Sequence, residues 1–433
     1  MAQITQQHHP EFSLWQSAVD QVVARHTRTV GDRPDTGHSM VAATAAAGVA
    51  LANGTSLAHQ VAGTSGTKGV VGDAAKYCAS IWWEIAKARL AGNHQAEQAW
   101  QARLGSFTTC DPRYAEAAEQ YVDFFKVKGG KVPYIVWKNL DDFIIDWKVP
   151  PKARIAILGD WGTGQPEAKA LLQAIAGKNP DIVIHLGDIY YSGTEFEMTN
   201  YFLNSWSSTF DLTKVRTFTL TGNHDMYSGG GAYYQLIQKL GQPASYFCLR
   251  NDDWQFIALD TGLHDDNALD ATPTFLEDTE VAWLKDKIAT AGNRRTVLLS
   301  HHQLFTANED IGGVAVNQKF KAQVASILPN VTVWFWGHEH NQVIYKPYQG
   351  VLGRCIGHAA YPVGITEISD EPNHPEVPTE DVKLTKGPSF YSHGYVVMDL
   401  DGAAARVAYY QDSDADDVAM YTETFGVAVA GND

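Results

Sequence analysis

The sequence has little cysteine, and its spacing excludes two common classes of small protein. The 433 residues include four cysteines, Cys78, Cys110, Cys248 and Cys355. They are too scattered to suggest a zinc knuckle or a redox motif. So low a density does not describe a disulfide scaffold, although it leaves open a single bridge between Cys78 and Cys110.

Long apolar runs are also missing. The amino-terminal segment has no basic stretch followed by an apolar one, so the sequence predicts no signal peptide. The most apolar early run, residues 40–52, is rich in alanine and too short to cross a bilayer. We therefore expect a cytoplasmic protein without a membrane span.

Positive charge is scarce. Lysine and arginine number 33 against 49 aspartates and glutamates, which gives a formal net charge of −16. An acidic chain without basic clusters argues against nucleic acid or an anionic membrane as the main partner. Attraction of an anionic substrate would have to come from local cations, and bound metal ions supply such charge.

The first 130 residues are predicted to form a helical accessory region. Apolar residues recur at helical spacing over residues 11–26, and Asp73 is a suitable N-cap for an amphipathic helix that follows it. No residue in this region shows metal or nucleophile spacing. We expect it to pack against the catalytic domain or to make an oligomer contact, and the alternative is a partner-docking role for Trp82 and Trp83.

Residues 131–433 are predicted to form an α/β domain built as a two-sheet sandwich. From Ala153 onward, apolar runs alternate with helical patterns, which is typical of a mostly parallel sheet with covered faces. After His340, strands follow one another without helices, and this predicts a second, more antiparallel sheet packed on the first. Residues 365–392 are expected to be a long surface loop that acts as a lid or contacts substrate. The expected helices are 167–176, 233–240 and 280–291, and the expected strands outside the motifs below are 132–137, 143–147, 343–345, 351–356, 395–400, 405–410 and 421–425.

Five apolar runs end in side chains that bind metals. In an open α/β sheet, ligands bind beyond the carboxyl ends of the strands. Carboxylates, amide oxygens and imidazoles together suit iron, manganese and zinc. The strand ends are Gly159-Asp160, Gly187-Asp188, Gly222-Asn223-His224-Asp225, His301-His302 and Gly337-His338-Glu339-His340.

These residues suggest phosphoryl chemistry. The two oxygens of Asp188 could bridge two ions, and such a pair, about 3.5–4 Å apart, clamps a phosphate and lowers the pKa of a shared water. His224 follows Asn223 directly, so it would project near the site without binding metal. It could donate a proton to the leaving oxygen or stabilise phosphoryl charge. Asp225 could fix the tautomer of His224.

Each motif alone has a structural explanation. A Gly-Asp pair after a strand is common turn chemistry, and Gly-Asn-His-Asp could be an Asx turn. His301 and His302 could be one core and one surface histidine. Their occurrence together, in this order and each at a strand end, favours a metal site.

The same series resembles the calcineurin-like metallophosphoesterases and, within them, the purple acid phosphatases. The distinguishing points are Asp160-Trp161-Gly162, where most relatives have Asp-x-His, and a tyrosine three residues after Asp188. The resemblance covers roughly residues 150–410. It implies hydrolysis of phosphomonoesters, on a small molecule or a phosphoprotein, by a metal-bridging hydroxide. A phosphodiesterase and a catalytically silent interaction scaffold are the alternatives.

The resemblance also implies which residues hold the two metals. Asp160, Tyr191 and His340 would bind the first ion, a ferric iron in the family. Asn223, His301 and His338 would bind a divalent iron, manganese or zinc ion, and Asp188 would bridge the two. In a reducing compartment a manganese pair is the alternative.

The remaining residues near the motifs receive other roles. His224 would face substrate, and His302, which adjoins a ligand, would be a further substrate-facing residue. Tyr191 is preferred as a ligand because Gly162 leaves the first metal short of one, although its neighbour Tyr190 shows that aromatic residues here could simply pack. His264 and His358 are interpreted as structural.

Overall fold

The computed structural model describes residue 93 and residues 132–265, 273–309, 311, 313–365, 368, 371–414 and 418–426. The helical region expected at residues 1–130 lies outside the described residues except for Asn93, so its helices and its boundary stay predictions. Within the described part of the chain, every helix is too short or too polar to cross a bilayer.

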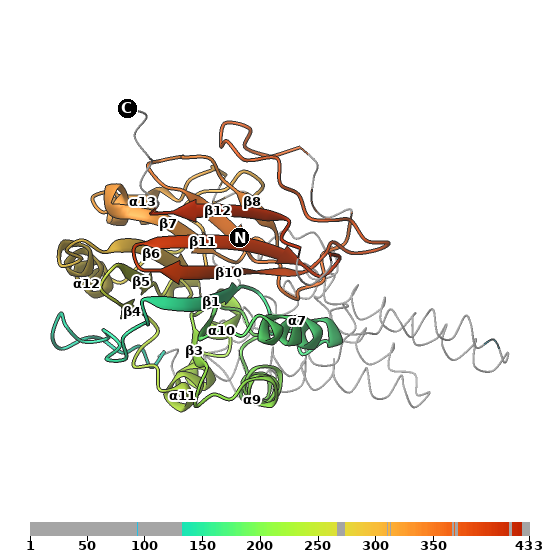
Figure 1. Cartoon of the computed structure of the whole chain (residues 1–433), viewed down its shortest axis with the longest axis horizontal. Helices are drawn as coiled ribbons and strands as arrows, with labels where there is room; N and C mark the ends of the chain where they lie inside the picture. The colour runs from blue at the N-terminus through green and yellow to red at the C-terminus, as the bar shows by residue number, and fades with distance from the viewer. Residues whose placement is uncertain are drawn as a thin grey trace, which may run out of the picture. The chain divides into compact units, whose positions relative to one another are not determined.

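The described strands form two six-stranded sheets, and β10, β11 and β12 of the first sheet lie side by side in Figure 1. In the first sheet the order is β12-β11-β10-β1-β2-β3, and in the second it is β4-β5-β6-β7-β9-β8. The first contains β1 (Lys152–Leu158), β2 (Ile182–His185), β3 (Arg216–Thr219), β10 (Gly394–Asp401), β11 (Ala404–Gln411) and β12 (Tyr421–Phe425). The second contains β4 (Phe247–Arg250), β5 (Trp254–Ala258), β6 (Arg295–Ser300), β7 (Val331–Trp336), β8 (Gln342–Ile344) and β9 (Gly353–Ile356).

Each sheet has a parallel part and an antiparallel part. β1, β2 and β3 run parallel, as do β5, β6, β7 and β9, while β10 pairs antiparallel with β1. The predicted two-sheet α/β sandwich is confirmed. The prediction that the strands after His340 form their own sheet is wrong, because β8 and β9 extend the sheet of β5–β7 whereas β10–β12 extend that of β1–β3.

Residues 132–150 do not form the expected strands. In the described chain they make one bridge, between Ile144 and Cys248. Their anchors are side chains of helix α12 (Asp278–Ala289): the indole N–H of Trp283 donates to the carbonyl of Asp142 over 2.8 Å, and the buried ammonium of Lys287 donates to the carbonyl of Leu140. Backbone N–H groups of Ile145 and Val149 also donate to carbonyls of Cys248 and Arg250 in β4, and the apolar residues of the segment pack partly on α12 and partly in the core between the sheets.

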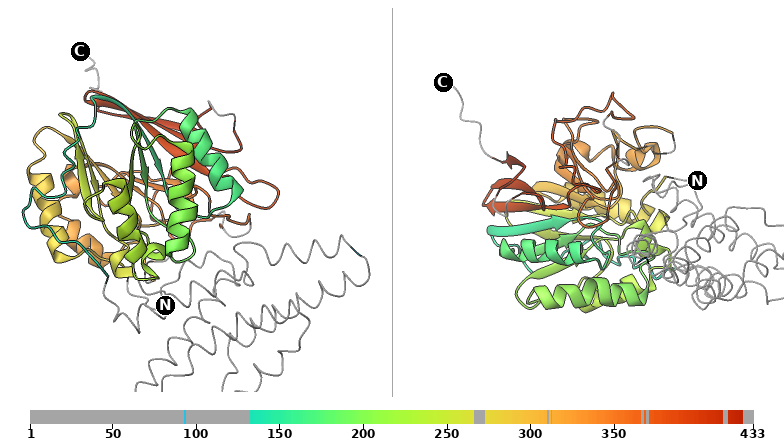
Figure 2. Two further views of the ribbon diagram at one scale, coloured as in Figure 1. Left: turned by 90° about the horizontal axis from the view of Figure 1, so that it is seen from below. Right: turned by 90° about the vertical axis from the view of Figure 1, so that its right-hand side faces the viewer.

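Helices cover the outer face of each sheet (Figures 1 and 2). Leu171, Leu172 and Ile175 on one face of α7 pack against the outer side of β1, where Ala156 and Leu158 lie. α7 also starts with Pro166, a position where the missing N–H costs no hydrogen bond. The helices over the first sheet are α7 (Pro166–Gly177), α9 (Asn204–Thr209) and α11 (Gly231–Leu240), and those over the second are α12 and α13 (Gln318–Val324). The predicted helices at 167–176, 233–240 and 280–291 are therefore confirmed as α7, α11 and α12.

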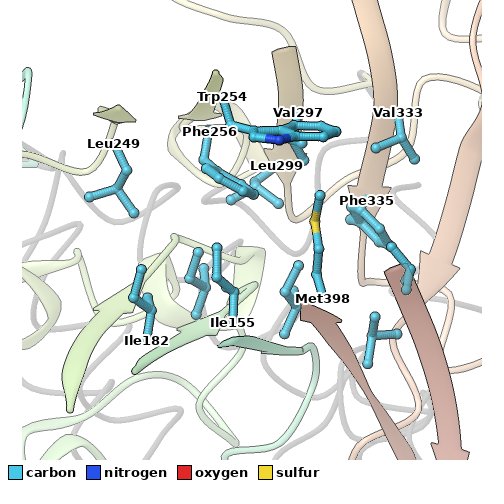
Figure 3. Close-up of a cluster of buried hydrophobic side chains, with 14 of the residues drawn as sticks. Ile155, Ile182, Leu249, Trp254, Phe256, Val297, Leu299, Val333, Phe335 and Met398 are labelled. Carbon is cyan, nitrogen blue, oxygen red and sulfur yellow. The ribbon is translucent and has the colours of Figure 1, made fainter. Parts of the chain in front are cut away.

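The two inner faces meet in an apolar core. Alternate residues of one strand go to opposite faces, so Val333 and Phe335 of β7 enter this core while Trp334 and Trp336 pack on the helices outside. Figure 3 shows Ile155 of β1 in this core. Burial of a large apolar side chain stabilises the fold by roughly 1.5–3 kcal/mol. The core therefore holds the strand ends in fixed positions.

The described residues of the segment 365–392 contain neither helix nor strand, as expected for a long loop. They lie between β9 and β10 and are attached by isolated bridges, among them Gly364–Phe390 and Tyr345–Thr379. Its role as a lid or substrate contact stays a prediction.

Candidate metal centre

The predicted metal-binding residues come together at the carboxyl ends of five strands. Asp160 follows β1, Asp188 follows β2 and Asn223 follows β3 in the first sheet. His301 follows β6, and His338 and His340 follow β7, in the second. Since the parallel strands of a sheet end at one edge, each sheet presents its candidate ligands together, and contacts between Asp160 and the residues after β7 join the two sets.

Asp160, Tyr190 and His340 form one cluster. The Tyr190 hydroxyl donates to Oδ1 of Asp160 over 3.0 Å and lies 2.7 Å from Nε2 of His340. Oδ1 of Asp160 is 3.3 Å from the same nitrogen, and Oδ2 accepts the backbone N–H of His338 over 2.8 Å. Burial raises the pKa of Tyr190 well above its ordinary value, and the nearby Asp160 adds to the rise.

The tyrosine whose hydroxyl reaches this cluster is Tyr190, for which the sequence predicted no ligand role. Tyr191 was the predicted ligand, and the contact seen for it at the site is made by its backbone carbonyl, which accepts from Nδ1 of His224 over 2.6 Å. The two tyrosines are adjacent in the sequence, and only the conformation of the turn decides which hydroxyl points to Asp160.

Asp188, Asn223, His301 and His338 form a second cluster. Oδ1 of Asn223 lies 3.1 Å from Nε2 of His301 and 3.1 Å from Nδ1 of His338. Oδ2 of Asp188 lies 3.4 Å from Nε2 of His301. Nδ1 of His301 faces the carbonyl oxygen of Leu186 at 3.0 Å and must carry a proton to bond with it. In the neutral ring, Nε2 therefore directs a lone pair at two oxygens.

Lone pairs that face one another repel, and a positive ion bound between them would remove this repulsion. Burial lowers the pKa of His301, but Asp188 and Asp160 reverse this effect and raise it to about 9. For Asp188, burial raises the pKa, yet His301 and His224 bring it well below its ordinary value. Asp160, Asp188 and His301 each offer one ligand atom within 4.8 Å of the others. A divalent or trivalent metal fits this donor set of carboxylate, amide and imidazole groups.

Asp225 has a different partner from the predicted one. Its carboxylate accepts the backbone N–H groups of Gly222 (2.7 Å), Asp188 (2.9 Å) and Ile189 (3.0 Å). The expectation that it fixes the tautomer of His224 is wrong, since the carbonyl of Tyr191 occupies Nδ1 of that ring. Asp225 instead ties the loop after β2 to the loop after β3.

His302 uses both ring nitrogens inside the protein. Nε2 lies 2.9 Å from Oδ2 of Asp265, and Nδ1 lies 3.1 Å from the hydroxyl of Thr261. The ring packs against His338, with 4.3 Å between centroids. These contacts favour support of His338 over the substrate-facing role expected for His302. His264 stacks on Phe275 and bonds to Glu277, while His358 is buried.

The backbone around the site adopts conformations that non-glycine residues rarely take. Asp160, Asp188, His338 and His340 have φ values of +60°, +73°, +68° and +37°. Backbone conformations of this kind concentrate at functional sites. A side chain is also excluded close to Asp188, because a Cβ at Gly222 would lie 2.0 Å from its Oδ1. The local backbone thus supports the carboxylates at the cost of unfavourable conformations.

Four arginines near the strands could be considered for phosphate binding, but their positions and contacts lie elsewhere. Arg294 and Arg295 stand at the amino end of β6, whereas His301 follows its carboxyl end. Arg250 bonds to the side chain of Gln255 near the start of β5, and Arg354 forms a buried pair with Glu423 at 2.6 Å. None of these contacts brings a guanidinium to the clustered strand ends.

Comparison with known proteins finds one family whose sequence model matches part of this chain. The sequence model of the family described as calcineurin-like phosphoesterase matches residues 153–342. A dimetal phosphatase from Danio rerio is 13% identical, with a TM-score of 0.43, over 64% of this chain and 99% of that chain.

Two further solved structures resemble the chain to a similar degree. GAP50, described as the anchor in the inner membrane complex of Plasmodium, is 13% identical with a TM-score of 0.39, over 64% of this chain and 89% of that chain. PhoD is 13% identical with a TM-score of 0.43, over 64% and 69%. A search of the curated proteins gave no match.

Proposed function

We propose that this chain, whose residues 153–342 belong to the calcineurin-like phosphoesterase family, hydrolyses phosphomonoesters at the clustered strand ends. The domain is a metal-dependent phosphoesterase. The observation that carries the proposal is the meeting of Asp188, Asn223, His301 and His338, where lone pairs from both sheets face one another in a buried site.

The first ion would be held by Asp160, His340 and Asp188, with a tyrosine completing the shell. The contacts of Tyr190 favour its hydroxyl over that of Tyr191 for this place. A phenol and two carboxylates suit ferric iron, as in the purple acid phosphatases that the sequence resembles. The second, divalent ion would be held by Asn223, His301, His338 and the other oxygen of Asp188. A manganese pair is the alternative composition.

When bound, the two ions would neutralise phosphate charge and supply a hydroxide near neutral pH. The protein's own residues orient the substrate and move protons. Nδ1 of His224 is fixed by the carbonyl of Tyr191, and Nε2 lies 3.9 Å from Oδ2 of Asp188, so it faces the centre. We assign His224 as the residue that binds the phosphoryl oxygens and donates a proton to the leaving group.

The natural substrate in this proposal is a phosphate ester of a small molecule or a phosphoprotein. The test is hydrolysis of a chromogenic phosphomonoester beside the matching diester, by the full chain loaded in turn with iron and manganese. We expect turnover of the monoester that depends on added metal. Asp188→Asn should abolish it, whereas Asp252→Asn, at an exposed position remote in sequence from the motifs, should not.

A preference for the diester would mean that the chain is a phosphodiesterase, with the same metal centre, and not a phosphomonoesterase. Metal-loaded protein that hydrolysed neither substrate would contradict the proposal and favour an interaction scaffold.

A further inference from the structure

A buried glutamate outside the metal cluster organises the turn that follows Asp188. Glu197, in the short helix α8 (Glu195–Glu197), is 4% exposed. One carboxylate oxygen accepts the backbone N–H of Tyr191, and the other accepts those of Ser192 (3.1 Å) and Thr194 (2.9 Å). Three donated bonds hold this carboxylate, and all three come from the backbone of one turn.

That turn serves the site in two ways. It places the hydroxyl of Tyr190 beside Asp160 and His340, and it directs the carbonyl of Tyr191 at Nδ1 of His224. The turn also packs tightly on the His224 loop, since a Cβ at Gly193 would lie 2.6 Å from Cα of Asp225. Small changes in its backbone would therefore be felt at His224.

One peptide unit connects Glu197 with His224. The carbonyl of Tyr191 and the N–H of Ser192 belong to the same planar group and point in opposite directions. Glu197 accepts from the N–H end over 3.1 Å, and His224 donates to the carbonyl end over 2.6 Å. A carboxylate at one end fixes the plane and strengthens the carbonyl as an acceptor, because hydrogen bonds in a chain polarise one another.

We propose that Glu197 is a positioning residue that sets the orientation and the Nδ1–H tautomer of His224 through the Tyr191–Ser192 peptide. The proposal rests on the proposed function for its catalytic consequence. With Nδ1 protonated, Nε2 is the nitrogen that takes up the reacting proton, and the imidazolium formed in this way delivers it to the leaving group. Loss of the carboxylate frees the peptide to rotate, and His224 then loses its fixed partner.

Glu197 also has a simpler role as a capping residue. Its bond to the N–H of Thr194, and the bond from its own N–H to the Thr194 hydroxyl (3.2 Å), make a capping box. Capping does not account for the bonds to Tyr191 and Ser192, which precede the cap. The two roles differ in their effect, since a lost cap changes stability and a lost positioning residue changes the chemistry of His224.

The test compares Glu197→Gln with Glu195→Gln, a change at an exposed glutamate of the same helix. The amide keeps the shape but turns an N–H₂ group toward backbone donors. The first measurement is the ¹⁵N spectrum of the His224 ring in the full chain loaded with diamagnetic zinc. We expect the Nδ1–H tautomer in the wild type and in Glu195→Gln, and a mixture of tautomers in Glu197→Gln with both zinc ions retained.

The second measurement compares a nitrophenyl phosphate with an alkyl phosphate, whose poor leaving group needs the proton. General acid catalysis contributes roughly 100-fold or more, so His224→Ala should lose about that much on the alkyl ester and less on the nitrophenyl ester. The rate of Glu197→Gln should fall roughly tenfold on the alkyl ester and less on the nitrophenyl ester. The double variant should be no slower than His224→Ala alone.

An unchanged tautomer in Glu197→Gln, or an additive loss in the double variant, overturns the proposal. If Glu197→Gln does not fold, Glu197→Asp, which keeps the charge and loses reach, is measured in the same way. Wild-type protein inactive on both esters would contradict the proposed function, while the tautomer measurement would still decide the positioning role.

Discussion

The hydroxyl of Tyr190 lies 2.7 Å from Nε2 of His340 and 3.0 Å from Oδ1 of Asp160. These two partners come from different sheets, so the phenol joins the strand ends of β1 and β7. Tyr190 also packs against His224, with 4.7 Å between ring centroids. The residue thus touches both the proposed first metal position and the proposed proton donor.

The choice between the two tyrosines has a spectroscopic test. A phenolate bound to ferric iron gives a visible charge-transfer band. In protein loaded with ferric iron, Tyr190→Phe should abolish this band, and Tyr191→Phe should retain it because Tyr191 acts through its backbone carbonyl. The opposite pattern would assign the ligand to Tyr191, as the sequence resemblance implies.

Removal of the Asp225 carboxylate should loosen the loops after β2 and β3 together. Asp225→Ala leaves three buried backbone N–H groups without their acceptor. Each such group costs roughly 1–3 kcal/mol, so we expect the free energy of unfolding to fall by about 3 kcal/mol or more, with weaker metal binding. Denaturant unfolding measures the first effect. Asp252→Ala, which removes an exposed carboxylate, is the control, and an equal loss in both variants would contradict the account.

Buried His185 should make the fold sensitive to acid. Burial lowers its pKa to about 3, and Nε2 has no hydrogen-bond partner within the described chain. Below pH 6.5 His185 binds a proton in the unfolded chain but stays neutral in the folded chain. The free energy of unfolding therefore decreases as the pH falls from 6.5 toward 3. The slope for one proton is about 1.4 kcal/mol per pH unit.

His185→Phe removes this titration and keeps an aromatic ring beside Trp161 and Phe202. Between pH 7.5 and 4.5, metal-free wild type should lose about 2–3 kcal/mol more than the variant. Urea unfolding of both proteins at the two pH values measures the difference. Parallel losses would show that His185 takes up its proton in the folded state.

Variants of a metal ligand and variants of the proton donor should differ in how much metal they bind. Asn223→Ala removes the oxygen that faces His301 and His338, and we expect it to lose both turnover and metal. His224→Ala should lose roughly 100-fold or more in kcat with its metals in place. Metal analysis beside kinetics tests both variants, and an empty site in His224→Ala would mean that His224 is a ligand.

The sequence predicted where the candidate ligands lie in the fold because these residues follow the strand ends, while their roles stay predictions. Each apolar run that ends in Asp, Asn or His became a strand whose carboxyl end carries that residue, as for Asp188 after β2 and His301 after β6. The spacing of apolar residues predicts which face of a strand is buried, but it does not predict which strands pair with it. For this reason β10 could not be assigned to β1 in advance.

The directions of side chains within turns could not be predicted from the sequence. Tyr190 reaches Asp160 from a turn bonded to Glu197, which lies six residues after Tyr191 and whose sequence pattern with Thr194 indicates only a helix cap. Asp225 was predicted to fix the tautomer of His224, whereas its carboxylate oxygens accept backbone N–H groups of two loops. Both cases depend on contacts that form only when the strand-end loops meet in the fold, those after β1 and β2 for Tyr190 and those after β2 and β3 for Asp225.

The most direct test of the binuclear centre is a titration of metal-free protein with Mn²⁺ by calorimetry. The account predicts two ions per wild-type chain, and a loss of at least one in Asp188→Asn, because the two oxygens of Asp188 would serve both ions. His185→Phe should bind as many ions as the wild type. A wild type that binds one ion or none, or an Asp188→Asn variant that still binds two with unchanged affinity, would contradict the binuclear site.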